Sequence, residues 1–186
     1  MKVRSEELID KLSELTYQHL KYVEFLSHLS DDDLQRRKNA HSWSVLECIE
    51  HLNLYMEFYL PEITEKIEFS KYENMEYFKS GLIGNYFAQL MLPKEKPTRM
   101  KTATKMNPKD KNLNRVVLTR FSEYLKRLLF LLQESRNVDL DKTRTKISIS
   151  QWIHLKLGDT FIFLVNHNTR HIAQVKQILS DQKINN

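Results

Sequence analysis

The sequence predicts an all-α protein, a four-helix bundle, on three observations. Four long segments repeat apolar side chains with a period of about 3.6 residues, which places those side chains on one face of a helix. Only three glycines and four prolines occur, and most lie between Gly81 and Pro108, which leaves long stretches without a helix breaker. The 186 residues are 41% hydrophobic, enough to enclose one sizeable core. We therefore expect a single domain over residues 1–186.

The first long helix is expected from Ser5 to His28. Its apolar stripe consists of Leu8, Leu12, Leu15, His19, Val23 and Leu26. A short helix should follow from Asp31 to Arg37, because Ser30 and Asp33 have the spacing of a capping pair.

The second long helix is expected from Ser44 to about Phe69. Ser44 and Glu47 have the spacing of a capping box at its start. Its stripe consists of Val45, Cys48, Leu52, Tyr55, Tyr59 and Ile63. Pro61 cannot donate a helical hydrogen bond, so we expect a kink or a break there.

The connection from Ser70 to Leu113 is unusually long. We expect one helix in it, from Tyr72 to Leu92, followed by a basic loop from Lys94 to Lys111. A long crossover of this kind lets the second and third long helices run parallel. The third long helix, from Asn114 to Ser135, should bury Val117, Phe121, Leu125, Leu128 and Leu132.

The fourth long helix is expected to begin near Asp159, which follows Gly158 and can cap the helix N-terminus. Its stripe consists of Phe161, Leu164, Val165, Asn168, His171, Ile172, Val175 and Leu179. Ile147 to Ser150 alternate apolar and polar residues, but one short run without a partner does not predict a sheet. Ser150 to Leu157 is predicted as a short helix.

Three of the seven histidines fall where a metal site could be built. His167 and His171 are one helical turn apart, so both project from the same helix face. They lie in an otherwise apolar stretch, where an unpartnered imidazole is costly. His51 could supply a third ligand from the second helix, and three ligands with an open fourth position are typical of a catalytic metal. Packing or exposure explains the other four, His19, His28, His41 and His154.

Residues near these histidines have two interpretations each. Gln174 and Arg170 could hold an imidazole by hydrogen bonding, although an exposed position or a salt bridge between helices explains Arg170 equally well. Glu47 is the nearest acidic candidate, but the capping box is its simpler account. Cys48 could be a soft metal ligand, and Tyr55 and Tyr59 could line the site, but we expect all three to pack in the core. Trp43 and Trp152 should wedge helix ends.

The charge pattern gives little support for a nucleic-acid or membrane partner. The net charge is +5, but basic and acidic residues are interspersed except from Lys94 to Lys111, which we interpret as a solvated loop rather than a rim for an anionic substrate. No apolar run approaches the ~20 residues that a transmembrane helix needs, and the start of the chain has no secretory pattern. With Cys48 as the single cysteine, we expect a cytoplasmic location.

Two blocks of the sequence resemble the DinB-like superfamily of metal-dependent enzymes. HSWSVLECIEHL, at residues 41–52, is similar to the family's tryptophan–serine helix start, which a histidine–leucine pair follows two turns later. HNTRHIAQ, at residues 167–174, is similar to its closing block, in which histidine, arginine–histidine and glutamine recur at this spacing. A weaker similarity lies at residues 99–108, and the resemblance as a whole covers residues 8–179.

The resemblance implies a DinB/YfiT-like four-helix bundle, which is dimeric in many relatives. It implies a divalent ion (zinc or nickel first, iron or manganese next) bound by His51, His167 and His171. It also implies a small-molecule substrate and, because relatives include bacillithiol and mycothiol transferases as well as hydrolases, a low-molecular-weight thiol. The sequence departs from the family at Asn168, where relatives often carry an acidic residue.

Two chemistries remain open at such a site. A metal bound by neutral imidazoles keeps its full charge, so it can acidify a bound water for hydrolysis or a bound thiol for transfer. Hydrolysis lacks an evident general base, because Asn168 stands where zinc proteases carry glutamate; this favours thiol transfer. The alternatives are a metal- or ligand-binding bundle without turnover and, supported by the basic loop alone, a nucleic-acid-associated protein.

Overall fold

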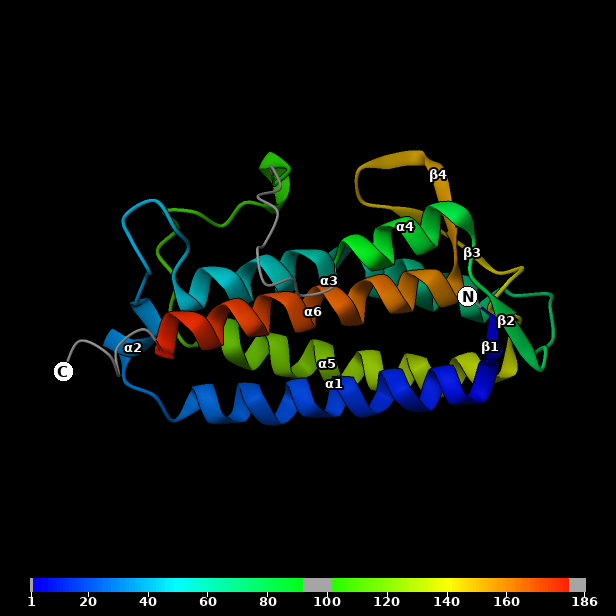
Figure 1. Cartoon of the computed structure of the whole chain (residues 1–186), viewed down its shortest axis with the longest axis horizontal. Helices are drawn as coiled ribbons and strands as arrows, with labels where there is room; N and C mark the ends of the chain where they lie inside the picture. Colours follow the sequence, from blue (N-terminus) through cyan, green and yellow to red (C-terminus); the bar gives the residue numbers. More distant parts are fainter. Residues whose placement is uncertain (1, 92–101, 181–186) are drawn as a thin grey trace.

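The computed structural model describes residues 2–91 and 102–180. Within them the helices are α1 (Ser5–Ser27), α2 (Asp31–Gln35), α3 (Val45–Glu68), α4 (Leu82–Leu90), α5 (Val116–Glu134) and α6 (Leu157–Ser180). The four long helices lie alongside one another (Figure 1), and α5 and α6 each pack against both α1 and α3. The predicted all-α four-helix bundle is confirmed.

The directions of the helices reflect the long crossover between α3 and α5. In Figure 1, α1 and α6 run toward the left, whereas α3 and α5 run toward the right. The second and third long helices, α3 and α5, are therefore parallel, as the long connection predicts. This connection contains α4 and the 3-10 turn η1 (Thr104–Met106). The stretch of the basic loop from Lys94 to Lys101 lies outside the described residues.

Local sequence sets the starts of α2 and α3. The Ser30 side chain accepts a hydrogen bond from the Asp33 N–H at 3.1 Å, and Ser44 and Glu47 form the predicted capping box. The predicted break at Pro61 is wrong, because α3 continues through it. A proline removes one internal hydrogen bond, and we attribute the continuity of α3 to the buried residues on either side of it.

A β-hairpin replaces the short helix predicted from Ser150 to Leu157. β3 (Arg144–Ile147) and β4 (Ser150–Lys156) pair antiparallel. Thr145 and Ile147 are buried while Arg144 and Lys146 are exposed. The alternation of buried and exposed residues therefore begins at Arg144, three residues before the run from Ile147 to Ser150 considered in the sequence. Each strand is the hydrogen-bonding partner of the other. The predictions of a helix from Ser150 to Leu157 and of no sheet are therefore wrong.

The helix predicted from Tyr72 to Leu92 is shorter within the described residues and spans only α4. The residues before it form β2 (Tyr77–Lys79), which pairs antiparallel with β1 (Lys2–Arg4). Phe78 at the centre of β2 is fully buried. Burial of this ring and pairing with the start of the chain favour the strand over a helix, and neither is visible in local sequence.

Asp159 does not cap its own helix, because α6 begins two residues earlier, at Leu157. Its carboxylate instead accepts hydrogen bonds from the Gly81 N–H, at 2.9 Å, and from the Ser80 hydroxyl, at the start of α4. Gly84 packs directly against this carboxylate, since a Cβ added there would lie 2.1 Å from Asp159 Oδ2. Asp159 therefore attaches α4 to α6.

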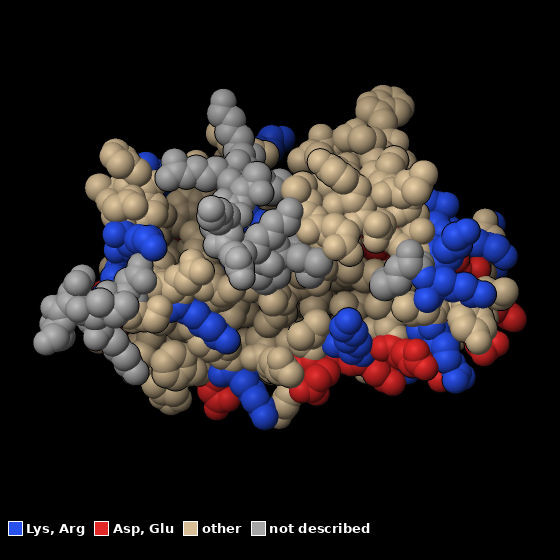
Figure 2. All heavy atoms as spheres, viewed as in Figure 1, with Lys and Arg blue, Asp and Glu red and all other residues tan. Residues whose placement is uncertain are grey.

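Charged side chains are distributed unevenly over the face shown in Figure 2. Lysine, arginine, aspartate and glutamate gather along α1 and around the β1–β2 end, whereas few lie over α4 and the β3–β4 hairpin. Among the described residues, no helix combines the length and the apolar character that crossing a membrane requires.

Candidate metal centre

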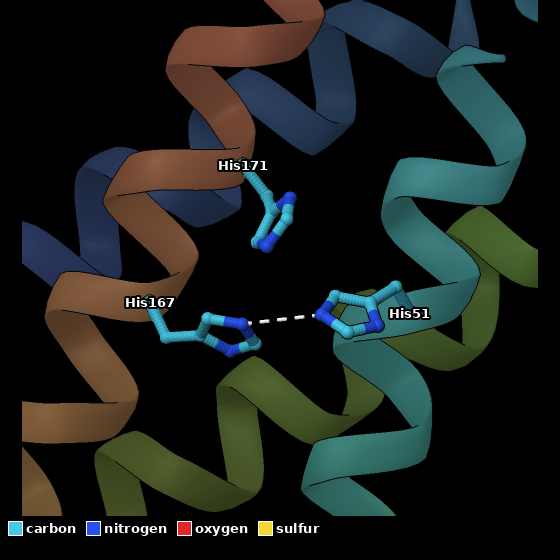
Figure 3. A group of neighbouring side chains, drawn as sticks. All are labelled: His51, His167 and His171. Atoms are coloured by element: carbon cyan, nitrogen blue, oxygen red, sulfur yellow. Dashed lines mark hydrogen bonds between the residues drawn. The ribbon is translucent and has the colours of Figure 1, made fainter. Parts of the chain in front are cut away.

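Helices α3 and α6 bring His51, His167 and His171 to one point in the bundle (Figure 3). One ring nitrogen from each histidine lies within 4.8 Å of the others, and Nε2 of His51 is 3.2 Å from Nε2 of His167. Each of the three residues is at most 8% exposed. The sequence placed these histidines on two helices, and the structure shows that the two helices juxtapose them.

Hydrogen bonds at Nδ1 set the tautomer of two of the rings. His51 Nδ1 lies 2.6 Å from the Met106 carbonyl oxygen, and His171 Nδ1 lies 3.0 Å from Oε1 of Gln174. Both oxygens accept hydrogen bonds, so each Nδ1 carries the proton. The lone pairs of His51 and His171 are therefore on Nε2. Gln174 makes the contact with an imidazole that its spacing suggested.

The third ring shows why this donor set fits a cation. His167 can supply a single N–H to its neighbours, and from Nε2 that N–H reaches the lone pair of His51. With the proton of His167 on Nε2, neither of the other two rings donates an N–H to the lone pair of His171. His167 Nδ1 is also buried and has no hydrogen-bond partner among the described residues. A divalent ion accepts a lone pair from all three rings. Three nitrogen donors suit such an ion well.

All three imidazoles are in the form that binds metals. Burial lowers the pKa of His51 from 6.5 to about 4. Burial also lowers the pKa of His167 and of His171 well below 6.5, and the neighbouring imidazoles lower both further. The three rings are therefore neutral at pH 7, with lone pairs available to a metal.

Aromatic side chains form the walls of the histidine cluster. The ring centroid of Trp43 lies 4.7 Å from that of His51, and the Tyr55 centroid lies 4.4 Å from that of His167. Phe163 stacks on His167 at 5.7 Å with an interplanar angle of 10°. Trp43 just precedes the N-cap of α3, so the predicted position at a helix end is right, and its contact with the cluster was not predicted. Apolar walls strengthen electrostatic interactions inside the site.

Several other sequence predictions can be compared with the structure. Trp152 is 93% exposed in the hairpin, so the prediction that it wedges a helix end is wrong. Cys48 is fully buried in the core, as expected, and burial raises the pKa of its thiol.

His19 is buried and lies 2.9 Å from the Thr169 hydroxyl, while His28, His41 and His154 are exposed. These four histidines lie outside the cluster.

Arg170 and Asn166 join α6 to the C-terminal end of α4. Arg170 donates to the Leu90 carbonyl at 3.2 Å, and Asn166 donates to the Ala88 carbonyl at 3.1 Å. A positive charge at a helix C-terminus is favourable. Arg170 thus joins two helices through a hydrogen bond to a backbone carbonyl, and its charge also lowers the pKa of His167 and His171.

The two acidic residues that flank the cluster on α3 are occupied elsewhere. The Glu47 carboxylate accepts from the backbone N–H groups of Ser44 and Asp110 and pairs with Arg37. Glu50 pairs with Arg120 of α5. In the described part of the chain, the group with metal-binding geometry consists of histidines alone.

The fold and the site together define a class, a four-helix-bundle protein with a buried three-histidine cluster that fits a metal ion. The chain belongs to the DinB superfamily, whose family model matches residues 14–175. The matched region includes His51, His167 and His171. Comparisons with curated proteins and with solved structures gave no match.

Proposed function

We propose that His51, His167 and His171 bind one divalent metal ion, and that the protein is a metal-dependent enzyme acting on small molecules, as a thiol S-transferase or a hydrolase. The observation that carries the proposal is the convergence of three buried, neutral imidazoles from two helices. Three protein ligands leave a further position for a substrate, whereas a structural site is closed by four. Zinc or nickel suits three nitrogen ligands best, with iron or manganese next.

A divalent ion at this site supplies Lewis acidity, which lowers the pKa of a bound water or thiol. The protein's own groups decide which of the two reactions it supports. Hydrolysis also needs a group that moves protons. Glu47 and Glu50 are engaged in ion pairs, and burial raises the pKa of Tyr55 to about 12, which keeps its hydroxyl protonated.

Thiol transfer makes fewer demands on the surrounding side chains. The sulfur forms the new bond to an electrophilic carbon, the leaving group departs with its electron pair, and the thiol proton passes to solvent. No general base is needed once the thiol is ionised. The neutral cluster leaves the charge of the ion uncompensated, which favours an anionic ligand such as a thiolate. We therefore favour a thiol S-transferase over a hydrolase.

The first test measures the metal content of the purified protein by mass spectrometry. His51→Ala and His171→Ala each remove one donor, so both should lose the near-stoichiometric metal expected in the wild type. His28→Ala is the matched control, because His28 is exposed and distant in sequence from the cluster. A wild type that takes up neither zinc nor nickel would contradict the proposal.

Trp43 gives a site-specific signal for the same binding event. The centroid of its ring lies 4.7 Å from that of His51. The chain has two tryptophans, so the Trp152→Phe variant keeps Trp43 alone as the tryptophan fluorophore. Nickel should therefore quench the fluorescence of this variant, and His51→Ala should abolish the quenching.

Activity assays then separate the candidate functions. Thiols are offered with small electrophiles, and amides or esters are offered alone. Metal-dependent thiol consumption that His171→Ala abolishes would support the transferase, and hydrolysis without thiol would support the hydrolase. Bound metal with neither activity would favour a metal-binding bundle without turnover.

A further inference from the structure

Glu47 makes more contacts than a helix cap requires. Its side chain is completely buried, and its Oε2 accepts from the Ser44 N–H at 2.7 Å, which completes the capping box. Its Oε1 accepts from the Asp110 N–H at 2.8 Å, and Arg37 pairs with the carboxylate at 2.8 Å. A capping box needs the bond to Ser44 alone. The bond to Asp110 instead attaches a loop to α3.

Asp110 adopts an unusual backbone conformation where this bond is made. Its φ is 62°, in the left-handed region that residues with a Cβ seldom occupy. Its side chain is exposed, while its N–H reaches the buried carboxylate of Glu47. The preceding residues are also ordered by local contacts, since Lys109 N–H donates to the Asn107 side chain at 3.1 Å and Pro108 is buried.

The other end of this loop contacts the metal centre. Four residues before Asp110, the carbonyl of Met106 accepts from Nδ1 of His51 at 2.6 Å. Glu47 and His51 are also four residues apart, one turn along α3. Residues 106–110, the strap segment, are thus attached to two successive turns of one helix. One attachment is the Glu47 carboxylate and the other is the imidazole of His51.

We infer that Glu47 is a positioning residue for His51, acting through the strap segment. By holding the Asp110 N–H, it keeps the Met106 carbonyl opposite Nδ1 of His51, which fixes the proton on Nδ1 and the lone pair on Nε2. Without that anchor, the imidazole of His51 is free to carry its proton on Nε2. Nε2 then has no lone pair to offer to a metal in the cluster. The effect on metal affinity rests on the proposed function, whereas the effect on the tautomer does not.

Glu47→Gln and Ser44→Ala separate this role from helix capping. Glutamine can cap the helix, but Ser44 and Asp110 donate to different carboxylate oxygens of Glu47, and the amide has an oxygen at only one of these two positions. Glutamine also cannot form the ion pair with Arg37. Ser44→Ala removes the hydroxyl that accepts from the Glu47 N–H at 3.1 Å and leaves the carboxylate in place. Nitrogen-15 NMR of the histidine rings in the metal-free protein reports the tautomer of His51. Competition with a chromophoric chelator reports zinc affinity.

We expect Glu47→Gln to shift His51 toward the Nε2–H tautomer and to weaken zinc binding about 10- to 100-fold, as loss of a group that orients a ligand does. Ser44→Ala should lower the melting temperature and leave both readouts as in the wild type. If Glu47→Gln does not fold, Glu47→Asp keeps the charge for Arg37 and withdraws the carboxylate from Asp110.

The inference is overturned if His51 keeps its Nδ1–H in the position-47 variants, or if Ser44→Ala shifts the tautomer as much as they do. The tautomer is measured without metal. A wild type that binds no zinc therefore contradicts the proposed function and leaves this comparison intact.

Discussion

Gln174 fixes one imidazole of the cluster with a single contact. It lies on α6 one turn beyond His171 and accepts from that ring's Nδ1 at 3.0 Å. When a metal-binding histidine loses such a partner, the free-energy cost of adopting the binding tautomer rises. Metal affinity then typically falls about 10- to 100-fold. The geometry of the ligands is otherwise unchanged, so the effect should appear in affinity rather than in the fold.

We expect Gln174→Ala to weaken zinc binding by about this factor while α6 stays folded. Chelator competition measures the affinity, and circular dichroism measures the helix content. Gln177→Ala is the control, because Gln177 is exposed on the same helix. Equal affinities in both variants would show that the Gln174 contact does not orient His171.

Residue patterns predict the three histidines better than the groups that orient them. His167 and His171 have ligand spacing, and His51 lies in a recognisable block, so side chains with metal chemistry are visible in the sequence. Met106 acts through a backbone carbonyl, which every residue possesses, and therefore leaves no signal. Trp43 precedes Ser44, the N-cap that the capping-box spacing predicts, but its contact with His51 depends on how the folded chain places its ring.

Among the elements, the contact between α1 and α6 buries a titratable group that has no role at the cluster. His19 of α1 donates from Nε2 to the hydroxyl of Thr169, which itself donates to the Val165 carbonyl. Nδ1 of His19 has no partner among the described residues. Burial lowers the pKa of His19 from 6.5 to about 4, with a smaller contribution from Lys176.

The sign of the resulting pH dependence follows from that lowered pKa. The unfolded chain protonates His19 near pH 6.5, whereas the folded chain resists protonation until about pH 4. Stability from this group is complete above pH 6.5 and is lost as the pH falls toward 4. Between pH 7 and pH 5 the loss should be about 2 kcal/mol.

His19→Gln should remove this loss, because glutamine can donate to Thr169 and does not titrate. Urea unfolding of the wild type and the variant at pH 7 and pH 5 measures the difference. The three cluster histidines titrate in both proteins, so the comparison isolates His19. If the two proteins lose the same free energy over this range, His19 does not resist protonation.

The elements that sequence predicts well are those that depend on local pattern. Both ends of the first three long helices and the start of the fourth were expected within two residues of those observed, because each helix repeats an apolar stripe over about 20 residues. The strands and α4 depend on distant partners. β2 pairs with the start of the chain, and α4 is attached at both ends by α6 side chains such as Asp159 and Arg170.

On the scale of the whole molecule, the surface over α4 and the hairpin differs from the surface along α1 on the face shown in Figure 2. Few charged side chains lie over α4 and the hairpin. Six exposed apolar residues form what we term the α4–hairpin patch, namely Leu82, Ile83, Tyr86, Ile149, Trp152 and Ile153. Leu82 and Trp152 are 95% and 93% exposed. Each of the six is at least 38% exposed, and exposed apolar side chains gathered in this way are typical of an interaction site.

Charge indicates which partner fits this patch. Few charged side chains lie around the patch in Figure 2, so a partner must present uncharged apolar surface to it. A symmetric dimer brings the same patch of both copies together, and a charge-poor apolar patch satisfies this condition. An anionic membrane would instead attract a face rich in lysine and arginine. We therefore propose that the protein forms a homodimer through the α4–hairpin patch.

Leu82→Lys combined with Trp152→Lys should convert this dimer to a monomer, because each copy would place two like charges against the other. Both side chains are almost fully exposed, so the fold should not change. Light scattering coupled to size-exclusion chromatography measures the mass. Phe25→Lys is the control, since Phe25 is 50% exposed on α1, away from the patch, and should leave the dimer intact. A monomeric wild type at every concentration would contradict the dimer, and its sedimentation with lipid vesicles would assign the patch to a membrane instead.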